Sequence, residues 1–170
     1  SGDFCSEVDG TILVESLSVA DNNLYEPAVA PNGNVYVAGK DNCVYCLDKD
    51  LTKVVWKYQH TDSAGKLVNA FNYSHPCVDT ENHLYITSGQ TGNVSYIFNA
   101  DGTVKESWTY GTSNQQKQMG GNNYLNGVLY SAFVGNTGDN GAFYGKYVGG
   151  ERANTWSTHG GDICGSCCLK

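Results

Sequence analysis

The sequence predicts an all-β protein of about three blade-like units, each a four-stranded antiparallel sheet, together with one extra N-terminal strand. Three observations lead to this prediction. Gly accounts for 21 of the 170 residues and aromatic residues for 12%, a composition typical of strands and turns. The three tryptophans, Trp56, Trp108 and Trp156, recur at intervals of 52 and 48 residues. Short apolar runs separated by turn residues precede each of them.

The runs come in the same order in each copy of the repeat. The first copy, residues 24–60, has strand-like runs at 27–29, 35–39, 43–48 and 54–58. The second, residues 71–112, has them at 76–78, 84–89, 94–99 and 106–110. The third, residues 119–158, is less regular, with runs at 124–125, 128–133, 142–147 and 154–157. Each copy therefore predicts a four-stranded meander, and the whole chain is expected to be one domain with a cysteine-rich tail at 159–170.

Residue types at equivalent places support the repeat. Asn32-Gly33, Asp101-Gly102 and Asn126-Gly127 favour tight hairpin turns, because these residues tolerate positive φ. Two sets of aromatic residues are expected to be equivalent between copies, one on second strands and one on fourth strands. These sets are Tyr36, Tyr85 and Tyr130, and Trp56, Trp108 and Trp156.

A single sheet of this kind cannot bury both faces, so the copies are expected to stack as propeller blades do. The run Pro-x-Val-x-x-x-Gly-x-Val-Tyr-Val-x-Gly at residues 27–39, a strand ending in Leu-Asp, and then Val-Val-Trp-Lys-Tyr resemble the blade repeat of the pyrroloquinoline-quinone-type (quinoprotein) β-propellers. Residues 76–110 and 124–156 match this pattern less closely. The resemblance implies the fold but not one activity, since the family includes dehydrogenases, outer-membrane assembly scaffold lipoproteins and sensor domains.

Three blades are fewer than the roughly seven or eight that close a ring in this family. Several chains could complete a ring or fibre, the chain could be a fragment, or the blades could close in an unusual way. The apolar run at residues 11–17 belongs to no blade. We expect it to pair with a blade at the C-terminal end of the same or a neighbouring chain, bringing Cys5 towards Cys164, Cys167 or Cys168.

The cysteine content favours an exported protein, secreted or extracellular/periplasmic, because cytosolic proteins rarely carry seven cysteines in a chain of this size. Asn72 and Asn93 each begin an N-glycosylation pattern, which agrees with secretion. Cys43 and Cys46 lie three apart on a predicted strand and so point to opposite faces, which leaves them as small packing residues or as partners of distant cysteines. The disulfide candidates are Cys5, Cys43, Cys46, Cys77, Cys164, Cys167 and Cys168.

No catalytic residue, metal ligand or cofactor is assigned. Zn²⁺ at the C-terminal cysteines with His159 is weighed against structural disulfides, which are preferred. Ca²⁺ at Asp48-Lys49-Asp50 or Asp139-Asn140-Gly141 is weighed against ordinary turn chemistry, which is also preferred. Cys167-Cys168 resembles the adjacent pair on which the cofactor stacks in quinoprotein dehydrogenases, but three blades cannot enclose a central cofactor. The four histidines, His60, His75, His83 and His159, do not cluster in the sequence.

Charge and hydropathy limit the partners. The net charge is −7, which provides no basic surface for nucleic acid, and no apolar run approaches the roughly 20 residues that span a bilayer. We therefore expect an exported, non-catalytic structural or interaction module that assembles with copies of itself or with another protein, with glycans as a further ligand class. The alternative is a fragment or subunit of a quinoprotein-like dehydrogenase or sensor domain.

Overall fold

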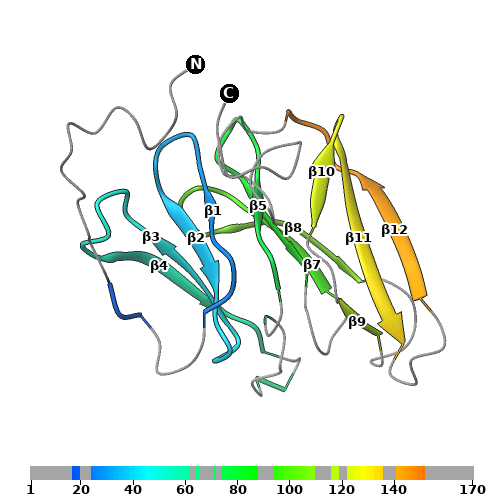
Figure 1. The fold of residues 1–170 in the computed structure, drawn as a ribbon, viewed down its shortest axis with the longest axis horizontal. Helices are drawn as coiled ribbons and strands as arrows, with labels where there is room; N and C mark the ends of the chain where they lie inside the picture. Colours follow the sequence, from blue (N-terminus) through cyan, green and yellow to red (C-terminus); the bar gives the residue numbers. More distant parts are fainter. Residues whose placement is uncertain are drawn as a thin grey trace, which may run out of the picture.

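A computed structural model describes residues 17–19, 24–61, 64–65, 71, 74–87, 94–109, 116–118, 122–135 and 141–151. Every regular element in these ranges is a β-strand, which confirms the all-β prediction. The same ranges contain no helix long and apolar enough to cross a membrane. The strands form three antiparallel sheets that lie side by side in chain order (Figure 1).

The first two sheets are meanders with the same strand order, and they contain the eight runs predicted from the sequence. Both have an irregularity in register between the third and fourth strands. The strands of the first sheet are β1 (Ala28–Val29), β2 (Val35–Ala38), β3 (Cys43–Leu47) and β4 (Val54–Gln59). Those of the second are β5 (Cys77–Val78), β6 (Leu84–Thr87), β7 (Val94–Phe98) and β8 (Val104–Thr109).

The third sheet departs from this plan. It has the order β10 (Asn123–Leu125), β11 (Val128–Gly135) and β12 (Gly141–Tyr147). A short strand that was not predicted, β9 (Gln116–Gln118), pairs with the far end of β11. The fourth run predicted for this copy, residues 154–157 with Trp156, lies outside the described residues.

The turns follow the predicted chemistry. Gly33 and Gly102 both have a φ of 88°, and each closes the turn between two strands. Asn126 and Gly127 have φ values of 51° and 76°, so both central residues of the β10–β11 hairpin are left-handed. That combination is typical of a two-residue type I′ turn, whose twist matches that of the flanking strands.

Strand register confirms the equivalence of the three tyrosines. Tyr36 lies opposite Ala28 and Cys46. Tyr85 lies opposite Cys77 and Ile97, and Tyr130 opposite Asn123 and Gly145, at the same step of their sheets.

The predicted equivalence of Trp56 and Trp108 is wrong. Trp56 lies opposite Cys46, and the corresponding position in the second sheet is Glu106, opposite Ile97. Trp108 instead takes the place of Tyr58, two residues further along the strand. A shift of two residues keeps a side chain on the same face of a strand. The alternation of apolar and polar residues therefore could not distinguish the two positions of the tryptophan.

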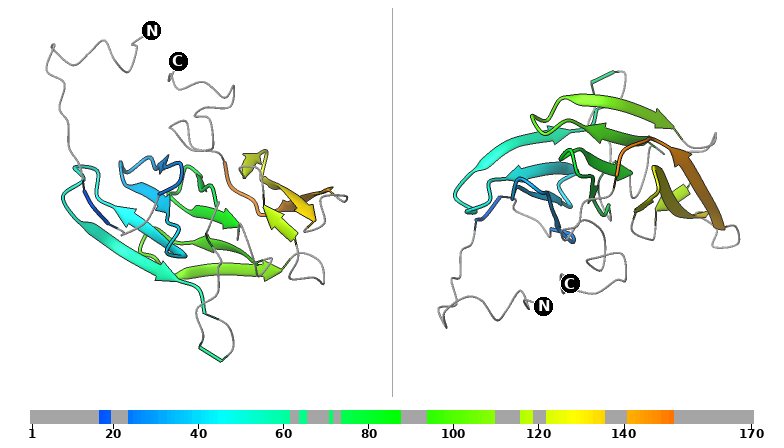
Figure 2. Two further views of the ribbon diagram at one scale, coloured as in Figure 1. Left: turned by 60° about the horizontal axis from the view of Figure 1, so that its bottom comes forward. Right: turned by 90° about the horizontal axis from the view of Figure 1, so that it is seen from above.

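The core lies between the sheets. One buried cluster joins the first sheet to the second, and another joins the second to the third. The first strands approach one another, β1 with β5 and β5 with β10, and the view from above in Figure 2 shows β4 and β8 on the opposite side of the molecule. The sheets are therefore packed face against face, and none of the three closes on itself.

A third cluster lies on the outer face of the first sheet, where Leu17 and Val19 pack against Val37, Tyr45 and Leu47. Residue 17 ends the run that was predicted to join a C-terminal blade. Within this chain Leu17 packs at the first sheet instead, because that sheet has its own apolar outer face to cover. Residues 11–16 and Cys5 lie outside the described residues.

Candidate interaction surface

Each sheet has two chemically distinct faces. The tyrosine face carries Tyr36, Tyr85 or Tyr130, according to the sheet. The aliphatic face is the opposite one, and it carries the residue one position earlier on the same strand, which is Val35, Leu84 or Leu129. At both interfaces the tyrosine face of one sheet packs on the aliphatic face of the next.

The interface between the first and second sheets is formed mainly by aromatic rings. The rings of Tyr58 and Phe98 meet edge to face with centroids 4.8 Å apart, and Trp56 lies 5.6 Å from Phe98. The indole N–H of Trp56 donates to the backbone carbonyl of Ala100 at 3.0 Å. The hydroxyl of Tyr36 donates to the carbonyl of Asn82 at 3.1 Å. These bonds satisfy the polar ends of rings that are otherwise surrounded by apolar atoms.

The interface between the second and third sheets follows the same plan with different chemistry. Tyr85 and Tyr124 stack with centroids 5.0 Å apart. The ammonium group of Lys146 lies 3.8 Å from the ring centre of Trp108 and also forms an ion pair with Glu106. This interface therefore combines one ring stack with a cation–π contact, whereas the first interface is built from several ring–ring contacts.

Several of the polar groups buried near this interface hydrogen-bond to one another or to the backbone. Thr87 and Ser95 share a hydroxyl–hydroxyl bond of 2.6 Å, and the hydroxyl of Ser131 donates to the side-chain oxygen of Asn122 at 2.9 Å. The amide of Asn122 in turn donates to the carbonyl of His75 at 3.0 Å. The bond from Asn122 to His75 connects the third sheet to the segment that leads into β5, so it helps to fix the relative position of the two sheets, which is a structural role.

The buried carboxylate of Asp79 is also held by its neighbours. It accepts from the hydroxyl of Tyr85 at 2.8 Å and lies 2.8 Å from Nδ1 of His83. Burial, and then the bond to Asp79, raise the pKa of Tyr85 well above its usual range. The other ring nitrogen of His83 is 3.1 Å from the ammonium group of Lys105. Both ring nitrogens of His83 therefore have polar partners, which fits a role in stabilising the turn better than a role in acid–base catalysis.

The tyrosine face of the third sheet differs from the other two because it is exposed. Phe143 is 71% exposed and Tyr147 is 75% exposed, while Leu125 is 43% exposed. By register, Phe143 occupies the position of Val44 in the first sheet and Ser95 in the second, which are both fully buried. An apolar face that elsewhere forms an interface is therefore left open to solvent here.

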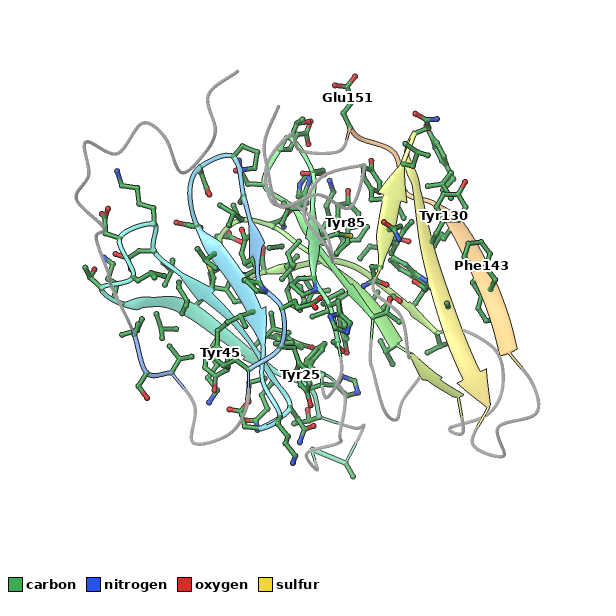
Figure 3. All side chains as sticks on the ribbon, in the orientation of Figure 1. Tyr25, Tyr45, Tyr85, Tyr130, Phe143 and Glu151 are labelled. Carbon is green, nitrogen blue, oxygen red and sulfur yellow. The ribbon has the colours of Figure 1, made fainter. Side chains whose placement is uncertain are left out.

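Figure 3 shows this surface at the outer side of β11 and β12, facing away from Tyr85. The ring of Tyr130 stacks on that of Phe143, with centroids 5.7 Å apart. Sequence reasoning did not identify Phe143 or Tyr147. The available signal was the run 141–147, where aromatic side chains fall on both faces of one strand and so predict two apolar faces.

The described cysteines are buried thiols that no disulfide joins to one another. Cys46 lies on the tyrosine face and Cys43 on the aliphatic face, which confirms that they point in opposite directions. Burial raises the pKa of Cys46 to about 12 and also raises that of Cys43. Four disulfide candidates, both glycosylation candidates and His159 lie outside the described residues; these are Cys5, Cys164, Cys167, Cys168, Asn72 and Asn93.

The acidic turn at Asp48 has a structural explanation. Its carboxylate accepts the backbone N–H groups of Thr52 and Lys53 at 2.7 and 2.9 Å, and the hydroxyl of Thr52 as well. These bonds lower the pKa of Asp48. The described ranges contain no group of three His, Cys, Asp or Glu side chains that could hold a metal ion, and residues 139–140 are not among them.

The other described histidines are separate from one another. His60 is bonded to Tyr96, and His75 lies 3.1 Å from a carboxylate oxygen of Glu26. Burial lowers the pKa of His75, which favours its neutral form. They form no shared site with His83 in the part of the chain that the structure describes.

No protein-family model matches the chain, and no curated protein matches it either. Among the described residues, the exposed tyrosine face is therefore the strongest candidate for a binding surface.

Proposed function

We propose that this chain is an exported, non-catalytic interaction module in which propeller-like blades stack in sequence and the last of them binds a further protein sheet. One observation carries the proposal. Phe143 and Tyr147 are largely exposed on a face whose counterparts on the other two sheets are buried. Burial of large apolar side chains is the main favourable term in association between proteins, so this face gains most by being covered.

Self-assembly is the form of interaction that the repeat favours. Each sheet already binds a neighbour of its own kind, so the exposed face needs no new type of partner. Export is supported by the seven cysteines. Because three of the seven are buried thiols, this support depends mainly on the four that lie outside the described residues.

The proposal is tested by light scattering of the purified chain over a range of concentrations. We expect the wild type to associate, and the double variant Phe143→Asp/Tyr147→Asp to stay monomeric. Both positions are exposed, so the substitutions should leave the fold intact, which circular dichroism checks. Val104→Asp is the matched control, because Val104 is an exposed apolar residue, 41% accessible, on the second sheet. A wild type that is monomeric throughout, or a double variant that associates equally well, would contradict the proposal.

A further inference from the structure

The first and last sheets present opposite halves of one repeating interface. The third sheet leaves its tyrosine face open, whereas the outer face of the first sheet is its aliphatic face. Tyr45 and Leu47 on that outer face correspond by register to Tyr96 and Phe98 of the second sheet. These two residues of the second sheet pack against the tyrosine face of the first sheet. The chain therefore carries both the exposed face and a surface of the kind that such a face packs on.

We propose that the chain associates head to tail with a second copy of itself. The tyrosine face of the third sheet in one copy packs on the aliphatic face of the first sheet in the other. This inference rests on the proposed function and names its partner. Since the two contacting surfaces are different, each dimer keeps one of each surface that is not occupied by a second copy. The assembly grows into a ring if the rotation closes and into a filament if it does not.

A symmetric contact between two tyrosine faces fits the structure less well. At both interfaces inside the chain a tyrosine face meets an aliphatic face. The protruding rings of Phe143 and Tyr147 would meet the same protruding rings in a symmetric pair. In the head-to-tail pair they meet an aliphatic face with smaller side chains than its counterpart on the second sheet, with Val37 in place of Ile86 and Leu47 in place of Phe98. Large side chains therefore face smaller ones, as close packing requires.

A short segment of the chain competes for this contact. Leu17 and Val19 are half-buried and pack against the aliphatic face of the first sheet, with Ser18 exposed between them. A docking sheet needs the same positions, so residues 17–19, which we call the cover segment, have to move aside. The cover segment therefore keeps the aliphatic face from solvent in a single copy and weakens association between copies.

The test uses the double variant Phe143→Asp/Tyr147→Asp with a fluorescent label on its amino terminus. In the head-to-tail arrangement this variant has lost its tyrosine face but keeps its aliphatic face. It should therefore remain monomeric alone and yet bind the unlabelled wild type, capping its growth. Sedimentation velocity with fluorescence detection measures both properties. In a symmetric arrangement the labelled variant would fail to bind the wild type.

A second change tests the cover segment. Leu17→Ser/Val19→Ser, added to the labelled double variant, removes the apolar contacts that hold the segment in place. We expect this quadruple variant to bind the wild type at least about tenfold more tightly than the double variant does. The matched control is Ser18→Ala, which alters the exposed residue of the same segment and should leave the affinity unchanged. Thermal melts establish that each variant is folded before binding is measured.

Each outcome has a definite reading. Binding of the double variant to the wild type, tightened by the cover-segment change, supports the inference. Failure of the double variant to bind an associating wild type overturns the inference and leaves the proposed function standing. If the cover-segment change does not tighten binding, residues 17–19 do not compete with a second copy for the aliphatic face. A wild type that is monomeric at every concentration overturns both the inference and the proposed function.

Discussion

The indole ring of Trp56 lies directly against Gly102, although the two residues belong to different sheets. A Cβ atom placed on Gly102 would come within 2.7 Å of the ring, closer than such contacts occur. The turn that holds Gly102 therefore fits under a ring of the neighbouring sheet only because the residue has no side chain. One glycine serves both the hairpin, through its φ of 88°, and the contact between sheets.

The first prediction follows from this contact. Gly102→Ala should lower the free energy of unfolding by about 2–4 kcal/mol, because a left-handed φ and an overpacked ring act together. Gly149→Ala is the matched control, since Gly149 has a φ of 73° but no atom within 4 Å of the new Cβ. The control should lose only about 1–2 kcal/mol from the unfavourable φ. Equal losses in urea denaturation of the two variants would show that the ring is not in contact.

A second prediction compares two phenylalanines. Phe98 is fully buried between the first and second sheets, and Phe143 is exposed on the third. Phe98→Ala should cost about 3–5 kcal/mol of unfolding free energy, because it leaves a cavity among aromatic rings. Phe143→Ala should change the stability of the monomer by no more than about 0.5 kcal/mol. Chemical denaturation at low protein concentration measures both, and a large loss for Phe143→Ala would mean that its face is covered within the chain.

The parts of the fold that could be predicted from the sequence are those governed by local chemistry. Alternating apolar runs and Asn-Gly or Asp-Gly turns located the strands of the first two sheets, because side-chain period and turn geometry are local properties. The positions of Trp108 and Trp156 were assigned from spacing alone, and Trp108 lies two residues from its predicted place. Loop lengths differ between copies, so register depends on pairing across strands and not on distance along the chain.

The candidate surface was harder to predict for a related reason. Exposure of Phe143 depends on which sheet packs on which, and the sequence of β12 carries no information on the neighbours of its sheet. The stacking itself could be anticipated, since one sheet cannot bury two faces. The position of Leu17 also depends on tertiary packing. The segment had two apolar outer faces to pack on, the aliphatic face of the first sheet and the tyrosine face of the third.

A third prediction concerns the reactivity of the thiols. Cys43 and Cys46 are fully buried, and burial is the main cause of their raised pKa values. Alkylating reagents attack the thiolate, so neither residue should be modified in the folded protein at about pH 8. Both should react fully after unfolding in guanidinium chloride without reductant. Peptide mass spectrometry reads each site separately. A site that stays unmodified in the unfolded protein would indicate that its sulfur is in a disulfide. That result would contradict the buried thiols of the structure.

The last prediction concerns alkaline pH and follows from the tyrosines between the sheets. Burial raises the pKa of Tyr36, Tyr85 and Tyr96 above the ordinary value of 10.0, and it raises that of Tyr124 to about 12. The folded protein therefore holds these protons more tightly than the unfolded chain does. The resulting stability is complete below about pH 10 and is lost as the pH rises through the folded pKa values, because in that range the unfolded chain releases the protons more readily than the folded protein does.

We therefore expect a cooperative alkaline transition. Tyrosinate absorbance from these residues and loss of the far-ultraviolet circular dichroism signal should rise together above about pH 10. Tyr124 has the smallest raised value of the four, and its hydroxyl donates to the carbonyl of Gly149, just after β12. The contact between the second and third sheets should open in this same transition, and Lys146 should leave the ring of Trp108 as it does so. Tryptophan fluorescence should therefore change together with the circular dichroism signal. Tyrosinate absorbance that rises to completion while the dichroism signal stays native would mean that these tyrosines are open to solvent and that the sheets do not pack as described.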